Sequence, residues 1–181
     1  MSSFLGPLYT EHYFYNCSKE YIDRINLNLF NEIISSIADM PKHETQSDIN
    51  RYLFTQLTQK GWSYDSIPPG TDHKPPSNNR NLCLTSSTLQ ANWHSDFAKE
   101  FDSGLVQLEV QFGKVEAMFK DFCGFQIAFA ERRLQLGIEI VMSQPYEYFA
   151  HRKASVSGMA YFGIAKETMP MIGLDWLVGI G

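Results

Sequence analysis

Residues 105–112 read LVQLEVQF, and this alternation decides the fold of the surrounding chain. In a β-strand, successive side chains point to opposite faces of the sheet. One face of this stretch is apolar and consists of Val106, Leu108, Val110 and Phe112. The opposite face is mostly polar. The stretch therefore predicts a strand with one side in a hydrophobic core.

A turn signal directly precedes this strand. Asp102, Ser103 and Gly104 are residue types that favour tight turns between strands. Residues 95–101 are therefore expected to form the antiparallel partner strand of a hairpin.

Hydrophobic periodicity indicates further elements on both sides of the hairpin. Helices are expected at residues 20–38, 47–61, 114–132 and 158–167. Strands are expected at residues 134–142 and 173–180, and a loop at the proline-rich residues 63–81. This order predicts an α/β fold with a central mixed β-sheet flanked by helices, in a single domain spanning residues 1–181.

The composition is that of an ordinary globular protein. Of 181 residues, 44% are hydrophobic and 19% are charged, and no apolar run approaches the roughly 20 residues that cross a bilayer. The formal net charge of −5 argues against broad, nonspecific coating of nucleic acid, although a local basic surface is compatible with it. Cys17, Cys83 and Cys123 are odd in number and widely spaced. We therefore expect neither a disulfide framework nor a structural zinc site, no membrane partner, and a cytoplasmic location.

Two carboxylates are expected to meet on the polar side of the hairpin. Glu109 and Gln111 project from the same side of their strand. A four-residue loop, Glu100–Ser103, would place Asp96 opposite Gln107, from where its carboxylate would reach Glu109 diagonally. Two close carboxylates suit a hard divalent cation such as Mg²⁺, which promotes phosphodiester hydrolysis. The alternative interpretation is a polar strand face that is only solvated.

Longer stretches resemble a known nuclease family. Five segments follow its order, namely INRYLFTQLTQKGW (49–62), DFAK (96–99), LEVQFGK (108–114), LQLGIEIVM (134–142) and SVSGMAYF (155–162). Together they resemble the BglII/BstYI group of type II restriction endonucleases, within the PD-(D/E)xK nuclease superfamily. The resemblance implies a restriction-endonuclease-like fold.

The resemblance also implies catalytic roles for individual residues. Asp96 and Glu109 are implied metal ligands, and Gln111 is an implied catalytic residue at a position where most of the superfamily has lysine. Twelve residues separate Asp96 from Glu109, four more than is usual in the family. An even insertion keeps each residue on its face. An alignment without the insertion would place Glu100 at the first acid position, and Asp102 is a third candidate.

DNA contacts are implied in the same way. Lys114 matches a position that approaches base edges, and Ser155 and Ser157 lie in a segment that reads the major groove. Arg152 and Lys153, just before these serines, can donate hydrogen bonds to guanine or to phosphates. A solvated basic loop is the alternative interpretation of that pair.

The expected function is that of a Mg²⁺-dependent, sequence-specific endonuclease of double-stranded DNA. We expect a homodimer, because a palindromic site matches a protein twofold axis. The resemblance implies that the helix at residues 114–132, with Phe and Met side chains expected to be exposed, is the dimer element. Alternatives are a structure-selective repair or resolvase nuclease, a catalytically inactive DNA-binding module, and a structural protein.

Overall fold

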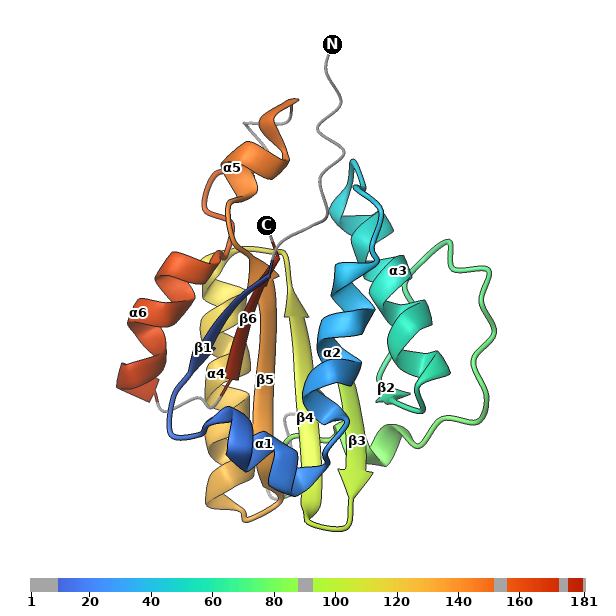
Figure 1. Cartoon of the computed structure of the whole chain (residues 1–181), viewed down its shortest axis with the longest axis vertical. Helices are drawn as coiled ribbons and strands as arrows, with labels where there is room; N and C mark the ends of the chain where they lie inside the picture. The colour runs from blue at the N-terminus through green and yellow to red at the C-terminus, as the bar shows by residue number, and fades with distance from the viewer. Residues whose placement is uncertain (1–9, 88–92, 152–155, 173–175, 181) are drawn as a thin grey trace.

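A six-stranded mixed sheet lies at the centre of the computed structural model, which describes residues 10–87, 93–151, 156–172 and 176–180 (Figure 1). Its strands are β1 (Thr10–Phe14), β2 (Ser63–Tyr64), β3 (Phe97–Phe101), β4 (Gly104–Gln111), β5 (Leu134–Met142) and β6 (Trp176–Ile180). Their order across the sheet is β1-β6-β5-β4-β3-β2. The pairs β4–β5 and β5–β6 are parallel, and the other pairs are antiparallel.

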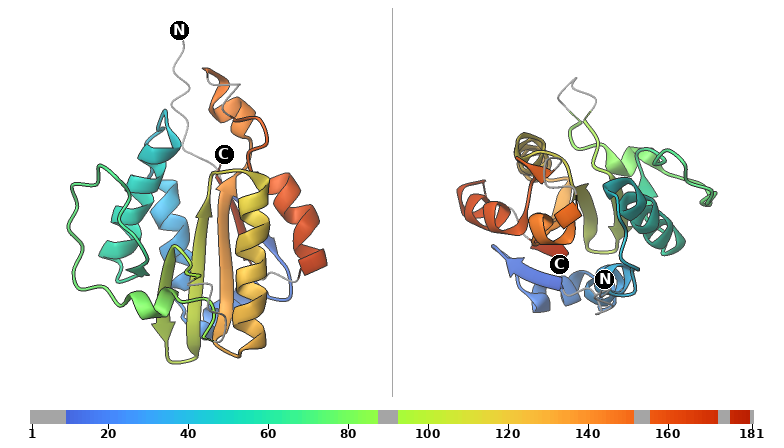
Figure 2. Two further views of the ribbon diagram at one scale, coloured as in Figure 1. Left: turned by 180° about the vertical axis from the view of Figure 1, so that it is seen from behind. Right: turned by 90° about the horizontal axis from the view of Figure 1, so that it is seen from above.

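Helices cover both faces of the sheet (Figures 1 and 2). One face carries α1 (Lys19–Ile25), α2 (Leu29–Ala38) and α3 (Gln46–Gln59). The other face carries α4 (Val115–Ala130) and α6 (Phe162–Ile172). A short α5 (Pro145–Tyr148) follows β5, and a 3-10 turn, η1 (Arg80–Cys83), precedes β3. The expected central mixed sheet flanked by helices is confirmed.

Each face of the sheet has its own hydrophobic core. Leu108 and Ile138 point towards the first three helices and pack with buried residues such as Phe54. Phe122 and Val141 belong to the second core, between the sheet, α4 and α6. In the described part of the chain, no helix is both long enough and apolar enough to span a membrane.

The helix expected over residues 20–38 is in fact two helices. α1 ends at Ile25, and Asn26 adopts an extended conformation with φ −161° and ψ 127°. The Asn26 side-chain oxygen accepts a hydrogen bond from the Asn28 N–H at 2.9 Å. Asparagine breaks the helix here because its side chain replaces the helical partner of a nearby backbone group.

The hairpin turn is tighter than expected. Phe101 pairs with Gly104, so that Asp102 and Ser103 alone connect the strands. Gly104 has a φ of 135°, which a residue with a Cβ rarely adopts. The expected loop Glu100–Ser103 is therefore wrong.

This turn changes the register of the hairpin by two residues. Ala98, and not Asp96, lies opposite Gln107. The same register places Asp96 across from Glu109, one step beyond the end of the ladder. The two acids thus face each other directly, where a diagonal approach was expected.

Candidate active site

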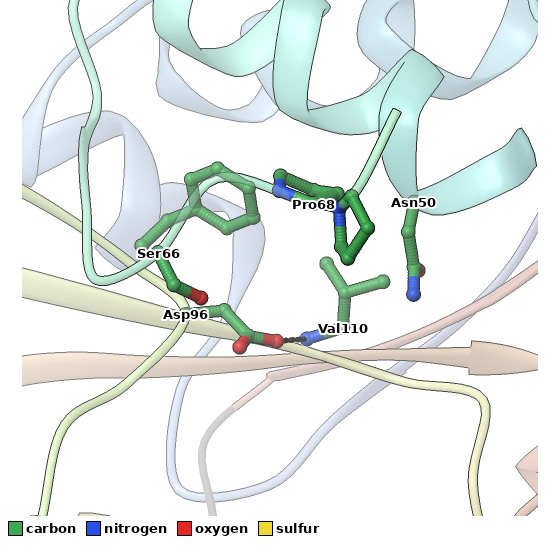
Figure 3. A pocket seen from close by; sticks show the side chains of 7 residues that line it. Asn50, Ser66, Pro68, Asp96 and Val110 are labelled. Atoms are coloured by element: carbon green, nitrogen blue, oxygen red, sulfur yellow. Dashed lines mark hydrogen bonds between the residues drawn. The ribbon is translucent and has the colours of Figure 1, made fainter. Parts of the chain in front are cut away.

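Asp96 and Glu109 lie side by side at the end of the β3–β4 ladder, next to the carboxyl end of β4. Glu109 Oε2 accepts a hydrogen bond from the Asp96 backbone N–H at 3.0 Å. Asp96 Oδ2 accepts one from the Val110 backbone N–H, also at 3.0 Å (Figure 3). These reciprocal bonds extend the pairing of the strands and hold the two carboxylates together.

The other two candidates for the first acid lie elsewhere on the hairpin. Glu100 pairs with Leu105, next to the turn. Asp102 is in the turn itself. Of the three candidates, Asp96 is the one that the structure places beside Glu109.

A cavity of about 230 Å³ opens beside the Asp96 carboxylate (Figure 3). Its lining comes from α3, from the segment after β2 and from the hairpin, and includes Asn50, Ser66, Pro68, Pro69, Phe97 and Val110. The Oδ1 atom of Asn50 is buried and has no hydrogen-bond partner among the described residues. The sequence contains no signal for Asn50, because a polar residue on an amphipathic helix predicts only a solvated face.

The polar face of β4 is buried, whereas a solvated face was the alternative considered from the sequence. Gln107 is 0% exposed and Glu109 is 7% exposed. Gln107 Nε2 donates to the backbone oxygens of Leu82 and Leu84, at 3.0 and 3.1 Å. The segment around η1 therefore covers this face, which explains why strand periodicity alone does not predict its burial.

Gln111 is hydrogen-bonded at both ends of its side-chain amide. Its Nε2 donates to Asp121 Oδ2 at 2.7 Å, and its Oε1 accepts from the Gly113 N–H at 2.7 Å. Asp121 belongs to α4 and is 7% exposed. The sequence gives no signal for Asp121, because its partner Gln111 lies on another element and the helical pattern contains no second acid beside it.

Glu139 is the fourth acidic residue of this region. It lies directly opposite Glu109 in the parallel pairing of β4 with β5. It is 0% exposed, and neither carboxyl oxygen has a hydrogen-bond partner in the described part of the chain. Burial, followed by the negative charges of Asp121 and Asp96, raises the pKa of Glu139 well above its ordinary value.

The same causes raise the pKa of the other three acids. Burial is the main cause of the raised pKa of Glu109, and the charge of Asp96 is the next. Burial and Asp96 likewise raise the pKa of Asp121 to about 6. Burial of the carboxyl group by the surrounding protein raises the pKa of Asp96 too, although Asp96 as a whole residue is exposed. Protons or a cation must offset the mutual repulsion of this group.

The donor atoms fit a hard divalent cation. Among the described residues, no three His, Cys, Asp or Glu side chains converge as a metal-binding group. Mg²⁺ does not require one, because one or two carboxylates commonly hold it while water and substrate phosphate supply the other ligands. Asp96 and Glu109 offer two such carboxylates side by side, and Asp96 lines the cavity.

Lys114 and Ser157 lie on two segments that pair with each other beside the site. Lys114 forms an isolated bridge with Met159, and the Val115 N–H donates to the Gly158 oxygen at 3.1 Å. Both Lys114 and Ser157 are exposed. The described residues do not include the other expected DNA contacts, Arg152, Lys153 and Ser155.

Most apolar side chains of α4 face the sheet. Met118, Phe122 and Phe125 are at most 1% exposed, whereas Phe119 is 38% exposed. The expectation that the Phe and Met residues of this helix are exposed is therefore wrong for these three. They are buried because α4 packs on the second face of the sheet.

Comparison with known proteins supports the nuclease interpretation of this geometry. The model of the family described as restriction endonuclease BglII/BglIII matches residues 10–173. No curated protein matches the chain.

The raised pKa of Glu139 predicts a pH-dependent stability. As the pH rises above the ordinary value of 4.5, the unfolded chain releases this proton first and the folded chain retains it. The folded state then binds more protons, so raising the pH lowers the free energy of unfolding, by up to about 1.4 kcal/mol per pH unit for one proton. In the E139Q variant, the side chain has nearly the same shape as that of glutamate but cannot ionise. Urea denaturation in EDTA from pH 5 to 8 should show a shallower loss of stability for E139Q than for the wild type.

E116Q is the matched control, because it makes the same chemical change at an exposed position of α4. Parallel pH profiles for E139Q and the wild type would contradict the prediction.

Proposed function

Because the chain belongs to the BglII/BglIII family of restriction endonucleases, we propose that Asp96, Glu109 and Gln111 form the active site of this sequence-specific type II enzyme. The observation that carries the proposal is the pair of reciprocal hydrogen bonds that places Asp96 beside Glu109. Neither Glu100 nor Asp102 has such a contact with Glu109.

Restriction endonucleases generally use divalent metal ions, and we infer that this one uses Mg²⁺. Asp96 and Glu109 would hold the ion, at the cavity that Asp96 lines. When bound, the cation supplies charge stabilisation at the phosphate and activation of water. Oxygen-only ligands favour Mg²⁺ over softer metals that prefer nitrogen or sulfur.

The protein's own groups supply orientation. The Asp96 and Glu109 carboxylates are anchored to backbone N–H groups of the hairpin. Gln111 is a neutral donor, one N–H of which binds Asp121. Its second N–H can donate to a phosphate oxygen or to the attacking water of the DNA complex.

We extend the proposal to base recognition by Ser157 and Lys114. Both are exposed, and their segments pair directly after the end of β4. A serine hydroxyl can donate and accept, and a lysine can donate to guanine O6 and N7. Ser155 is proposed to contact bases as well, and Arg152 and Lys153, just before it in the sequence, are proposed to contact bases or phosphates.

The acid assignment is tested by cleavage of phage genomic DNA into discrete fragments with MgCl₂, with EDTA as the blank. D96N and E109Q should lower the cleavage rate by more than about 100-fold, because loss of residues that merely support metal ligands already costs about 10- to 100-fold. Both amides still offer an oxygen to the backbone N–H partners, so the hairpin should persist. E100Q, the matched control, should cleave normally. An inactive E100Q beside an active D96N would overturn the assignment.

The specificity assignment is tested by S157A. Once the fragments reveal the cleaved site, binding is titrated in Ca²⁺ on that duplex and on a scrambled one. Loss of a base contact should cost about 1–3 kcal/mol on the cognate duplex and little on the scrambled duplex. S103A, in the hairpin turn, is the control. An equal loss on both duplexes would mean that Ser157 contacts the backbone.

We further propose that the enzyme is a homodimer, because a twofold protein matches a palindromic site and supplies one active site per strand. Sedimentation equilibrium at micromolar concentration should give twice the chain mass of 20.7 kDa. A monomer, both free and on DNA, would contradict this proposal.

A further inference from the structure

The side-chain amide of Gln111 is held by two short hydrogen bonds before any substrate binds. Asp121 accepts from its nitrogen and Gly113 donates to its oxygen, each at 2.7 Å. A glutamine side chain loses up to about 2 kcal/mol of conformational freedom when it is fixed. The two bonds stabilise one orientation of the amide in advance, which lowers the cost of ordering it in the DNA complex.

If stability were the only consideration, an aspartate would be unfavourable at position 121. The residue is 7% exposed, on the helix face that packs against the sheet. The charge of Asp96 acts against its ionisation. Burying a carboxylate near other carboxylates costs free energy unless hydrogen bonds or a cation compensate. The bond from Gln111 is such a compensation, and it links Asp121 to the proposed site.

We propose that Asp121 is a positioning residue, which fixes the amide plane of Gln111 and thereby the direction of its second N–H towards the reacting phosphate. This inference rests on the proposed catalytic role of Gln111. Asp121 acts through Gln111 and does not itself contact the substrate.

Gly113 holds the other end of the amide and offers an independent way to disturb it. A Cβ at position 113 would lie 2.7 Å from Gln111 Oε1. The contacted atom is the end of a flexible side chain, so alanine would push the amide aside with little effect on the backbone. G113A should therefore displace Gln111 while leaving Asp121 unchanged.

The kinetic test compares kcat and KM at saturating MgCl₂. D121A should lower kcat about 10- to 100-fold, in the range seen when a supporting hydrogen bond is lost, with KM for DNA unchanged. D121N still presents an acceptor oxygen and should recover most of kcat. The double variant D121A/Q111A should be no slower than Q111A, because both changes remove one interaction. G113A should lower kcat as well, and E116A, on the exposed side of α4, is the control.

A readout without metal or DNA separates this inference from the proposed function. In ¹⁵N-correlated NMR spectra, the side-chain NH₂ signals that disappear in Q111A belong to Gln111. They should be dispersed in the wild type and D121N, and should collapse towards the values of exposed glutamines in D121A and G113A. Dispersed Gln111 signals in D121A would show that Asp121 does not fix the amide.

Three kinetic results would also overturn the inference. They are multiplicative losses in D121A/Q111A, a D121N variant as slow as D121A, and a fully active Q111A. If the wild type forms no discrete fragments with Mg²⁺, the proposed function fails, whereas the NMR comparison still decides whether Asp121 holds Gln111.

Discussion

The reciprocal hydrogen bonds between Asp96 and β4 are the contact on which the rest of the site depends. Asp96 and Glu109 each commit one carboxyl oxygen to a backbone N–H, those of Val110 and Asp96 respectively. Both N–H groups lie where the ladder ends and would otherwise lack a strand partner. The second oxygen of each carboxylate can serve a cation. The hydrogen bonds that extend the hairpin therefore also position the proposed metal ligands.

This arrangement costs stability in the absence of a cation. Glu109 and Glu139 lie opposite each other on two parallel strands and are nearly or fully buried, and the negative charge of Asp121 on α4 acts on both. Every one of these carboxyl groups has a raised pKa. The folded protein therefore either binds protons at these groups or bears the repulsion between their negative charges. The two hydrophobic cores, one on each face of the sheet, compensate for this penalty. A functional site that strains the fold in this way is expected where charge must be concentrated.

Strong hydrophobic periodicity predicted the regular elements. Features that depend on contacts between distant parts of the chain could not be predicted in this way. β4, β5, α3 and α4 follow their expected segments because each buries one face against the sheet. β1 was not expected, since its five residues pair with β6 at the opposite end of the chain. The turn residues are compatible with two loop lengths, so they could not set the register that places Asp96 opposite Glu109. Asn50, Asp121 and Glu139 have no local signal, because their environment is created by elements distant in the sequence.

The structure also joins the proposed base-reading segment to the side-chain amide of Gln111 through one residue. The Gly113 N–H binds Gln111 Oε1, and the Gly113 carbonyl accepts the Ala160 N–H at 2.8 Å. Ser157 lies three residues before Ala160, in a segment that bridges to the residues after β4. The Gly113 N–H and C=O belong to two adjacent peptide units that share its Cα, so a displacement of residues 158–160 reaches Gln111 through rotation about the backbone bonds of Gly113. Two hydrogen bonds, both made by Gly113, therefore connect the proposed base-reading segment with the amide of Gln111 that is proposed to act in catalysis.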